Sequence, residues 1–461
     1  MSTILRSPQF LSLHGLLVVL GLLTYVLTTH SLQQRRSSTG AISWVLTIAL
    51  IPYVGLPLYV LFGTRKMVRP GGRSPRTVPG PDLDSPDAWP RQLAASMGLP
   101  PVASYRNLRI HADGTQALDS LWEMIDGAER EVELCTFLIG RDTVGEALEA
   151  RLIVKARSGV RVRLLIDGVG RLMGGAVGLR QLKQAGVQVA VYGPILHVPF
   201  KSRTNLRNHR KMVVADGTRL WCGGRNLAAE YFESVGRQGP WKDLTFDLEG
   251  PLAAQARDLF ERDWAAATGS PTVQSVETAQ NAAEPFAQVI ASGPDQADDT
   301  VHDLLVAACF KARSRILALT PYFVPGDALL MALSLAARQG LDVDLVIPAR
   351  SNHHMADFVR HRALRGLASA GGRVWMAPYM LHGKAVVIDD SLALAGSANL
   401  DSRSLFLNYE LMVAFYADAD VRRFAGFIDK HREAADRYAV RNPGLVRDLG
   451  EGLVLWLAFQ L

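Results

Sequence analysis

The chain is poor in the residue types that support redox or metal chemistry. It has only three cysteines, Cys135, Cys222 and Cys309, and their spacing matches neither a disulfide framework nor a metal-binding pattern. We therefore expect buried core thiols. No cluster of carboxylates typical of a two-metal catalytic site is evident, so we expect no metal and no cofactor. Lysine is also scarce, since only 9 of the 50 basic residues are Lys, and each Lys in a motif is informative.

Charge is missing from two long stretches near the N-terminus. Residues 7–29 and 37–64 contain no Asp, Glu, Lys or Arg. Because about 20 apolar residues cover the roughly 30 Å hydrocarbon core of a bilayer, we expect two transmembrane helices, near 11–29 and 41–62. A cleaved signal peptide is the alternative for the first stretch, but a second apolar stretch follows at once. Pro52 and Pro57 argue against a straight second helix, although membranes tolerate them.

Basic residues flank the second stretch and indicate its orientation. Five follow it, Arg65, Lys66, Arg69, Arg73 and Arg76, whereas Arg35 and Arg36 lie in the intervening loop. Short cytoplasmic flanks are enriched in Lys and Arg, so we expect a multi-pass protein of the inner (cytoplasmic) cell membrane with most of the chain in the cytoplasm. The formal net charge of +6 suits an anionic partner, and the apolar stretches favour lipid over nucleic acid.

One short pattern occurs twice. His209, Lys211 and Asp216 share the spacing His-x-Lys-x4-Asp with His382, Lys384 and Asp389, 173 positions later. Six residues after each Asp comes a Gly-rich element that ends in Asn226 or Asn399. Chance repetition of His, scarce Lys and Asn at equal spacing is improbable, so we interpret these residues as one kind of site that occurs twice.

The sequence around each motif also repeats. Residues 156–167 align with 337–348 as a helix end, a Gly and a β-rich strand. The same order of a helix end, a Gly and a strand recurs at 179–192 and 364–377. Alternating helices and strands predict two homologous α/β halves. Packing about a pseudo-twofold axis would bring both His–Lys pairs to one seam. The first half has about 12 extra residues before His209, which favour a substrate-lining loop over a plain surface loop.

This set of residues suits transfer at a phosphodiester. A neutral imidazole can attack phosphorus, and a second His can protonate the leaving alkoxide and deprotonate the acceptor. Lys211 and Lys384 offer cations, and Asn226 and Asn399 offer amide donors, for the charged phosphoryl oxygens.

Four carboxylates belong to the pattern. Asp216 and Asp389 end an extended segment about 23 Å long, so we expect them to brace the strand ends and not to touch the histidines. Asp243 and Glu410 follow the two histidines by 34 and 28 residues and are the expected carboxylates that orient them, with a surface position as the alternative.

These residues resemble the phospholipase D superfamily, whose mark is a duplicated His-x-Lys-x4-Asp motif, and within it the bacterial cardiolipin synthases. The narrower resemblance rests on residues 51–63, 205–211, 292–295, 320–325 and 399–410. It implies transfer of a phosphatidyl group from one phosphatidylglycerol to another, which gives cardiolipin and glycerol through a phosphatidyl-histidine intermediate. The implied nucleophile is His209 and the implied general acid/base is His382, although the reverse assignment stays open.

Alternatives within the superfamily are a membrane-bound phospholipase D that uses water, a phosphatidylserine synthase that uses serine, and a nuclease, which would not need the apolar spans. An inactive lipid-binding scaffold is the alternative from another class. Phospholipid and membrane are the expected partners, nucleic acid is not, and the oligomeric state stays open. The expected organisation is membrane helices (1–66), a Pro/Gly/Arg-rich linker (67–100), lobe 1 (101–267), a spacer (268–299) and lobe 2 (300–461). The apolar end of lobe 2, residues 453–461, is too short to span and is expected either on the bilayer surface or on the core.

Overall fold

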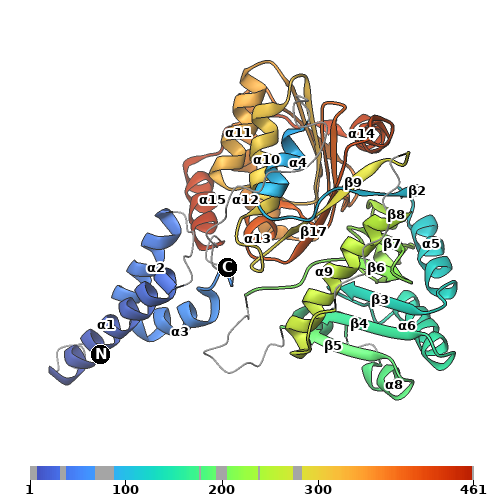
Figure 1. Cartoon of the computed structure of the whole chain (residues 1–461). Coiled ribbons are helices and arrows are strands. Elements are labelled where there is room, and N and C mark those ends of the chain that lie inside the picture. Colours follow the sequence, from blue (N-terminus) through green and yellow to red (C-terminus); the bar gives the residue numbers. More distant parts are fainter. Residues whose placement is uncertain are drawn as a thin grey trace.

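Two α/β lobes and a projecting helical arm make up the computed structural model (Figure 1). The structure describes residues 8–31, 38–67, 88–175, 178–193, 205–236, 239–273 and 283–458. The inserted loop before His209, most of the proline-rich linker and the last three residues lie outside the described residues.

The arm holds three helices, α1 (Pro8–Ser31), α2 (Ser38–Leu50) and α3 (Pro52–Phe62). Among the described residues, one helix is long and apolar enough to cross a membrane, at Leu13–His30 within α1. The expectation of a second spanning helix is not confirmed, because the segment breaks at Ile51 into two short apolar helices. Pro52 supplies the physical reason, since proline cannot donate the helical N–H and disfavours helical geometry in the residue before it.

Helices α2 and α3 fold back on each other as a hairpin. The rings of Trp44 and Tyr59 lie 5.2 Å apart, whereas one continuous helix would separate the two residues by about 22 Å. Gly55 permits this approach, because a Cβ there would lie 2.7 Å from the carbonyl oxygen of Thr47. The second apolar segment is therefore a helical hairpin packed beside α1.

Lobe 1 is built on a seven-stranded sheet in the order β2-β8-β7-β6-β3-β4-β5. Its strands are β2 (Arg106–His111), β3 (Glu131–Thr136), β4 (Arg161–Asp167), β5 (Gln188–Tyr192), β6 (Met212–Ala215), β7 (Arg219–Gly223) and β8 (Thr245–Glu249). Only β3, β4 and β5 pair in parallel, and the other pairs are antiparallel. The first motif leads directly into the central strand β6.

Seven consecutive strands of the nine-stranded sheet in lobe 2 repeat this sheet. The order β9-β17-β15-β14-β10-β12-β13 matches that of lobe 1, with the same parallel and antiparallel pairs. The strands are β9 (Phe286–Ser292), β10 (Arg315–Leu319), β12 (Asp342–Pro348), β13 (Arg373–Ala377), β14 (Ala385–Ile388), β15 (Leu392–Gly396) and β17 (Glu410–Phe415). The predicted duplication of an α/β unit is confirmed.

Helices form the outer layers and fill the space between the sheets. The outer helices are α5 (Gly114–Asp126), α6 (Thr143–Arg157) and α8 (Leu179–Gln184) in lobe 1, and α10 (Thr300–Lys311), α11 (Asp327–Arg338) and α12 (His354–Ser369) in lobe 2. Helices α9 (Pro251–Thr268) and α14 (Asp418–Glu433) join residues of both sheets in one central core. In β6, Met212 and Val214 face this core while Val213 and Ala215 face the outer one, as a two-residue period requires.

Two predicted boundaries are wrong in part. The spacer 268–299 contains β9, a buried strand of the second sheet. The linker 67–100 ends in α4 (Trp89–Ser96), which packs into the core of lobe 2, and β1 (Ala103–Ser104) pairs with β9. Ala94, Met97 and Leu99 explain the correction, because they are apolar and buried although they follow a proline-rich stretch.

Candidate active site

The two motif histidines lie at the seam between the lobes, and each contacts a carboxylate of the opposite lobe. Nδ1 of His209 lies 3.1 Å from Oε1 of Glu410. Nδ1 of His382 lies 2.7 Å from Oδ2 of Asp243. Both carboxylates are fully buried, and each contacts the Nδ1 of its His, so the Nε2 of each ring is not bound by a carboxylate.

The backbone holds this crossed arrangement in place. The N–H of His209 donates to the carbonyl of Tyr409 at 2.9 Å, next to Glu410. The N–H of His382 likewise donates to the carbonyl of Lys242 at 2.6 Å, next to Asp243. Asp243 and Glu410, which the sequence analysis expected to orient the histidines, do contact them, but the sequence order placed each with the His of its own half. That pairing is wrong, because the pseudo-twofold packing exchanges the partners.

Burial shifts the pKa values of the site. It lowers the pKa of His209 to about 4, and Lys211 adds to the shift. It lowers the pKa of His382 to about 3, with Lys384 as the next cause. The lysine of the other lobe also lowers the pKa of each His, so both motifs share one electrostatic environment. Both imidazoles are therefore neutral near pH 7.

The two lysines lie against their own histidines. Nζ of Lys211 donates to the carbonyl of His209 at 2.8 Å. Nζ of Lys384 lies 2.7 Å from Nδ1 and 3.1 Å from Nε2 of His382. Burial lowers the pKa of Lys211 to about 8 and that of Lys384 to about 7, so an anion at this seam would restore their full charge.

Asp216 and Asp389 lie at the far ends of the motif strands. The carboxylate of Asp216 accepts hydrogen bonds from the backbone N–H groups of residues 129–131. That of Asp389 accepts from the N–H groups of residues 313–315. Both residues have a positive φ, 53° and 50°. They organise the turn that joins each motif strand to its neighbour. In the part of the chain that the structure describes, they do not contact the histidines.

Asn226 and Asn399 follow the strands next to the motif strands and are buried. Nδ2 of Asn226 donates to the hydroxyl of Tyr231 at 2.7 Å, and Nδ2 of Asn399 donates to Oγ of Ser404 at 3.2 Å. The Oδ1 of each amide is buried without a hydrogen-bond partner in the part of the chain that the structure describes. Each amide therefore retains one end for a further contact.

Aromatic side chains that the sequence analysis missed surround both imidazoles. Phe137 lies 5.1 Å from the ring of His209, while Tyr231 and Trp241 lie 5.1 and 5.6 Å from that of His382. Tyr322 lies 6.3 Å from His382. A signal was present in the sequence. Phe137 follows Thr136 at the end of β3, and Tyr322 lies two residues after the equivalent Thr320, which directly follows β10. These rings contribute to the burial that lowers the pKa of both histidines.

The differences between the motifs have structural causes. A Cβ at Gly224 would lie 2.3 Å from Oδ1 of Asp243, so any side chain at this position would displace that carboxylate, whereas the equivalent Ser397 donates a hydrogen bond to Glu410. A Cβ at Gly383 would lie 2.9 Å from Leu319. These close contacts hold the backbone beside His382 in place.

Arg210, the residue between His209 and Lys211, joins the lobes. Its buried guanidinium donates to the carbonyl of Glu410 at 3.1 Å and pairs with Asp263 of lobe 1 and with Asp295 of the chain that follows β9. These carboxylates raise its pKa against the opposing effect of burial. The contact fixes the chain on both sides of the His209–Glu410 pair.

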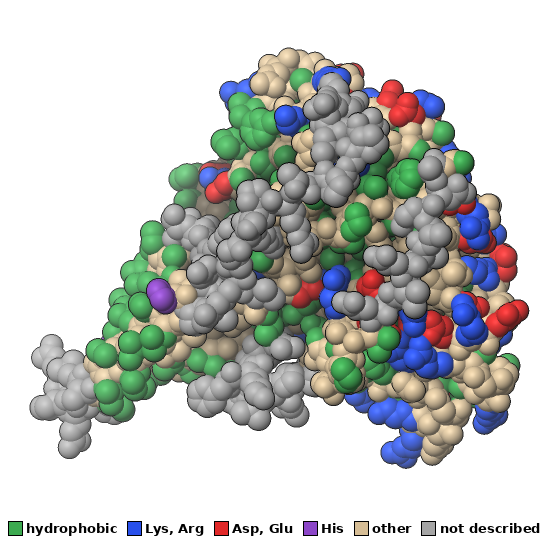
Figure 2. All heavy atoms as spheres, in the orientation of Figure 1, with side chains coloured by type: hydrophobic (Ala, Val, Ile, Leu, Met, Phe, Trp, Pro, Cys, Tyr) green, Lys and Arg blue, Asp and Glu red, His purple; other side chains and the backbone are tan. Residues whose placement is uncertain are grey.

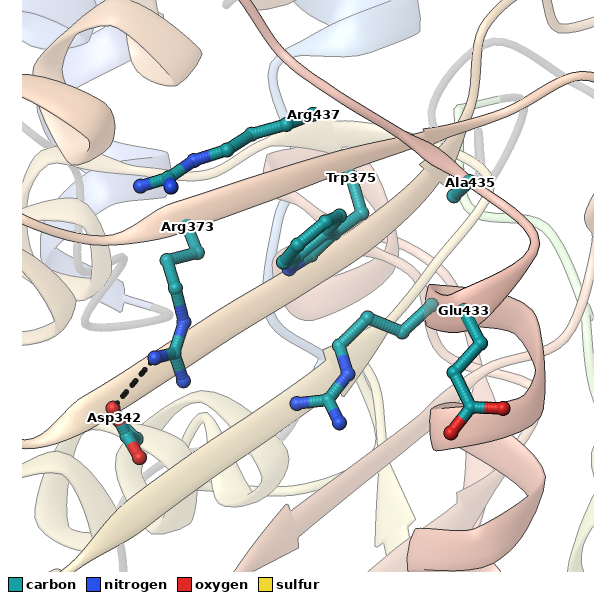
Figure 3. A pocket seen from close by; sticks show the side chains of 7 residues that line it. Asp342, Arg373, Trp375, Glu433, Ala435 and Arg437 are labelled. Carbon is teal, nitrogen blue, oxygen red and sulfur yellow. Dashed lines mark ion pairs between the residues drawn. The ribbon is translucent and has the colours of Figure 1, made fainter.

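A surface cavity of about 510 Å³ lies elsewhere on lobe 2 (Figure 3). Its walls come from the ends of β12, β13 and α14 and include Asp342, Arg373 and Trp375. Arg373 pairs with Asp342 at 2.8 Å and also with Asp344. Since carboxylates already neutralise this arginine and no motif residue lines the cavity, the reacting groups are at the seam and not here.

Comparisons with known proteins agree with this geometry. The family model "Cardiolipin synthase, PLD-like domain" matches residues 121–264 and 305–432, and a "Phospholipase D-nuclease N-terminal" model matches residues 16–63. The chain is 30% identical to Cardiolipin synthase A of Pseudomonas aeruginosa over 93% of this chain and 90% of that protein. It is 31% identical to Cardiolipin synthase A of Pseudomonas putida (strain W619) over 88% of each.

A solved structure shares the fold. The phosphatidylserine synthase of Haemophilus influenzae superposes with a TM-score of 0.62 at 14% identity, covering 81% of this chain and 98% of that chain. The family match covers the strands and helices that carry both motifs. The chain therefore belongs to the cardiolipin synthase family of the phospholipase D superfamily.

Proposed function

We propose that this protein is a cardiolipin synthase that transfers a phosphatidyl group from one phosphatidylglycerol to the terminal hydroxyl of another, releasing glycerol. The observation that carries the proposal is the crossed pair of His–carboxylate contacts at 3.1 and 2.7 Å, which brings two neutral imidazoles and two lysines to one seam. Family membership adds the lipid chemistry, because the curated relatives carry this name.

The first step forms a bond between Nε2 of His209 and phosphorus and breaks the bond from phosphorus to the glycerol oxygen. His382, which takes up a proton when the anionic phosphodiester binds, donates that proton to the glycerol oxygen, and glycerol leaves. In the second step the terminal hydroxyl of another phosphatidylglycerol attacks phosphorus while His382 takes its proton. Cardiolipin forms and His209 is released, so atoms and protons balance over the cycle.

The two histidines differ in a way that supports this division of labour. The His209 side chain is 17% exposed and that of His382 only 5%. A nucleophile needs open access to phosphorus, whereas a general acid/base must keep its proton until the proton is transferred. Asp243, with a pKa lowered to about 2, stabilises the protonated form of His382 once an anionic phosphate is bound.

Lys211, Lys384 and the two asparagines bind the phosphoryl oxygens in this proposal. The ammonium groups neutralise charge on the nonbridging oxygens, and rotation of the amides presents their N–H groups to the same oxygens. Asp216 and Asp389 brace the motif strands. Glu410 and Asp243 hold the imidazole rings in one tautomer.

The test is direct. Purified protein is incubated with phosphatidylglycerol in detergent, and cardiolipin, glycerol and phosphatidic acid are quantified. Equal amounts of cardiolipin and glycerol are expected. Phosphatidic acid as the main product would support a phospholipase D, a product with serine a phosphatidylserine synthase, and no turnover a lipid-binding scaffold.

We further infer that α1 is the single span and that the α2–α3 hairpin enters the same membrane and returns. Tyr53 at the start of α3 lies beside His14, and Tyr59 near its end lies beside Thr28. The tip of the hairpin is therefore level with the first half of α1, and both of its ends are level with the C-terminal end of α1.

This topology supports a cytoplasmic position of the lobes. Arg35 and Arg36 precede the hairpin, while Arg65 and Lys66 follow it, so both basic flanks belong to one side of the membrane. An impermeant maleimide should label Ser2→Cys in intact cells and Val154→Cys only after permeabilisation. Labelling of both cysteines only after permeabilisation would support two spans instead.

A further inference from the structure

The C-terminal helix α15 (Leu445–Ala458) carries a row of exposed apolar side chains. Leu445, Leu449 and Leu453 recur at four-residue spacing and are 76%, 64% and 59% exposed, and Val446 beside them is 85% exposed. Four-residue spacing places side chains on one face of a helix. This face of α15 therefore points away from the protein.

The opposite face of α15 is fixed to lobe 2. Glu451 is fully buried and pairs with Arg365 of α12 at 2.6 Å and with Arg447 of its own helix at 3.0 Å. Phe358 of α12 lies next to Gly450. Because the polar face is bound to α12, the helix cannot rotate to bury its leucines.

Helix α12 continues the apolar surface. Met355 is 55% exposed and Phe358 is 38% exposed. We call these two residues and the four on α15 the apolar ridge. Arg362 and Arg441 are exposed on α12 and on the chain before α15. On α15 itself Arg447 pairs with Glu451, and Asp448 is half exposed, so the net positive charge near the ridge comes from α12 and the chain before α15. Apolar rows with Arg at their sides are typical of helices that lie in a bilayer surface rich in anionic lipid.

The arm places the bilayer near this surface. The carbonyl of Phe62, the last residue of α3, accepts a hydrogen bond from Asn205. Arg65 and Lys66 then pair with Asp299 of lobe 2, each at 2.8 Å. The arm is thus tied to the body where the hairpin ends, and Figure 1 draws α15 on the side of lobe 2 from which the arm projects. Figure 2 shows hydrophobic side chains over that arm.

We propose that the apolar ridge of α12 and α15 lies in the surface of an anionic bilayer and forms a second membrane contact of lobe 2, separate from α1. This proposal rests on the membrane placement argued above. The contact would hold the seam at a fixed height over the lipid headgroups, so that both phosphatidylglycerols reach the histidines without leaving the bilayer.

A depth measurement tests the proposal without any use of activity. The full chain carries a nitroxide on Leu449→Cys and is reconstituted in bilayers that contain phosphatidylglycerol. The three native cysteines are buried, so the label goes to the introduced thiol. Val154→Cys is the matched control, because Val154 is 65% exposed on α6 of lobe 1, far from the arm in Figure 1.

The nitroxide at position 449 should be relaxed by oxygen and protected from a water-soluble nickel complex, with the opposite result at position 154. Equal nickel access at both positions would overturn the proposal, and so would dipolar broadening between labels of two copies, which would identify a dimer interface.

A paired assay separates this proposal from the enzymatic one. Leu449→Glu with Leu453→Glu should lose activity severalfold on phosphatidylglycerol in bilayers and keep it on short-chain phosphatidylglycerol in detergent. Equal activity of this variant and the unmodified protein in bilayers would overturn the ridge contact. Absence of activity in the unmodified protein under both conditions would instead overturn the proposed function, while the depth measurement would still decide the position of the ridge.

Discussion

Oε1 of Glu410 lies 3.1 Å from Nδ1 of His209, although 201 positions separate the two residues in the chain. The pseudo-twofold-related contact joins Asp243 to His382 across 139 positions. Neither lobe holds a complete His–carboxylate pair, so neither can orient its own imidazole. The lobes depend on each other for chemistry, and their seam is itself the site.

The first prediction concerns the crossed carboxylates. Glu410→Gln should lower kcat on the order of 10²-fold or more, because the amide no longer stabilises the ring of His209 in its reactive tautomer. In a protein that already carries His209→Ala, Glu410→Gln should lower kcat little further. In a protein that carries Asp243→Asn, it should lower kcat again. Glu146→Gln, at an exposed position of α6, is the control and should be silent. Additive losses for Glu410→Gln and His209→Ala would contradict the pairing.

The second prediction concerns the glycine that replaces a serine. Gly224→Ser copies the residue of the other motif, but its Cβ would collide with Asp243 at 2.3 Å and displace it from His382. We expect a loss of kcat close to that of Asp243→Asn, measured with the folded protein. Ser397→Ala, the reciprocal change, removes one hydrogen bond to Glu410 and should cost less. Full activity of Gly224→Ser would show that Asp243 can move freely.

The third prediction concerns pH. The pKa of His209 is lowered to about 4, so this nucleophile stays neutral across the usual assay range. The pKa of Lys384 is lowered to about 7, so this cation loses its proton as the pH rises through 7. The value of kcat/KM should therefore fall on the alkaline side, between pH 7 and 8. The value of kcat should fall only at a higher pH than kcat/KM does, because bound phosphate favours the charged form of the lysine. A loss on the acidic side near pH 6.5 would contradict this assignment.

The fourth prediction separates the motif aspartates from the chemistry. Asp216→Ala removes the acceptor for three backbone N–H groups and should lower the free energy of unfolding by about 1 to 2 kcal/mol. Asp216→Gly accepts the φ of 53° more easily and should lose less, which isolates the contribution of the carboxylate. Denaturant unfolding measures both. The folded variants should keep kcat within a few-fold, and a loss as large as that of His209→Ala would place Asp216 in the reaction.

Periodicity and duplication predicted the strands and helices around both motifs, because buried strands such as β6 and β14 show strong local patterns. They also pointed to the two histidines and the two lysines that meet at the seam, but not to the aromatic residues around them. They could not predict the exchange of Asp243 and Glu410 between lobes, since this depends on how two sheets pack and leaves no trace in local spacing. The roles of Arg210 and Gly224 depend on the same packing.

The membrane arm was harder to predict for a related reason. Hydropathy measures apolar length, and residues 41–62 are long enough to span. Whether such a segment crosses the membrane or turns back depends on Pro52 and on the close contact of Gly55 with Thr47. A hydropathy average over a window of residues does not include these features. The strand β9 was missed because it follows a weakly patterned stretch.

The most direct test of the account is to trap and map the covalent intermediate. Protein that is turning over phosphatidylglycerol labelled in its acyl chain is quenched in cold denaturant at mildly alkaline pH, where both the phosphoryl-histidine bond and the acyl esters survive, and it is then digested and analysed by mass spectrometry. The account predicts a phosphatidyl group on the peptide that contains His209, absent in His209→Ala. A label on His382 would reverse the two roles, and cardiolipin formation without any labelled histidine would contradict the account.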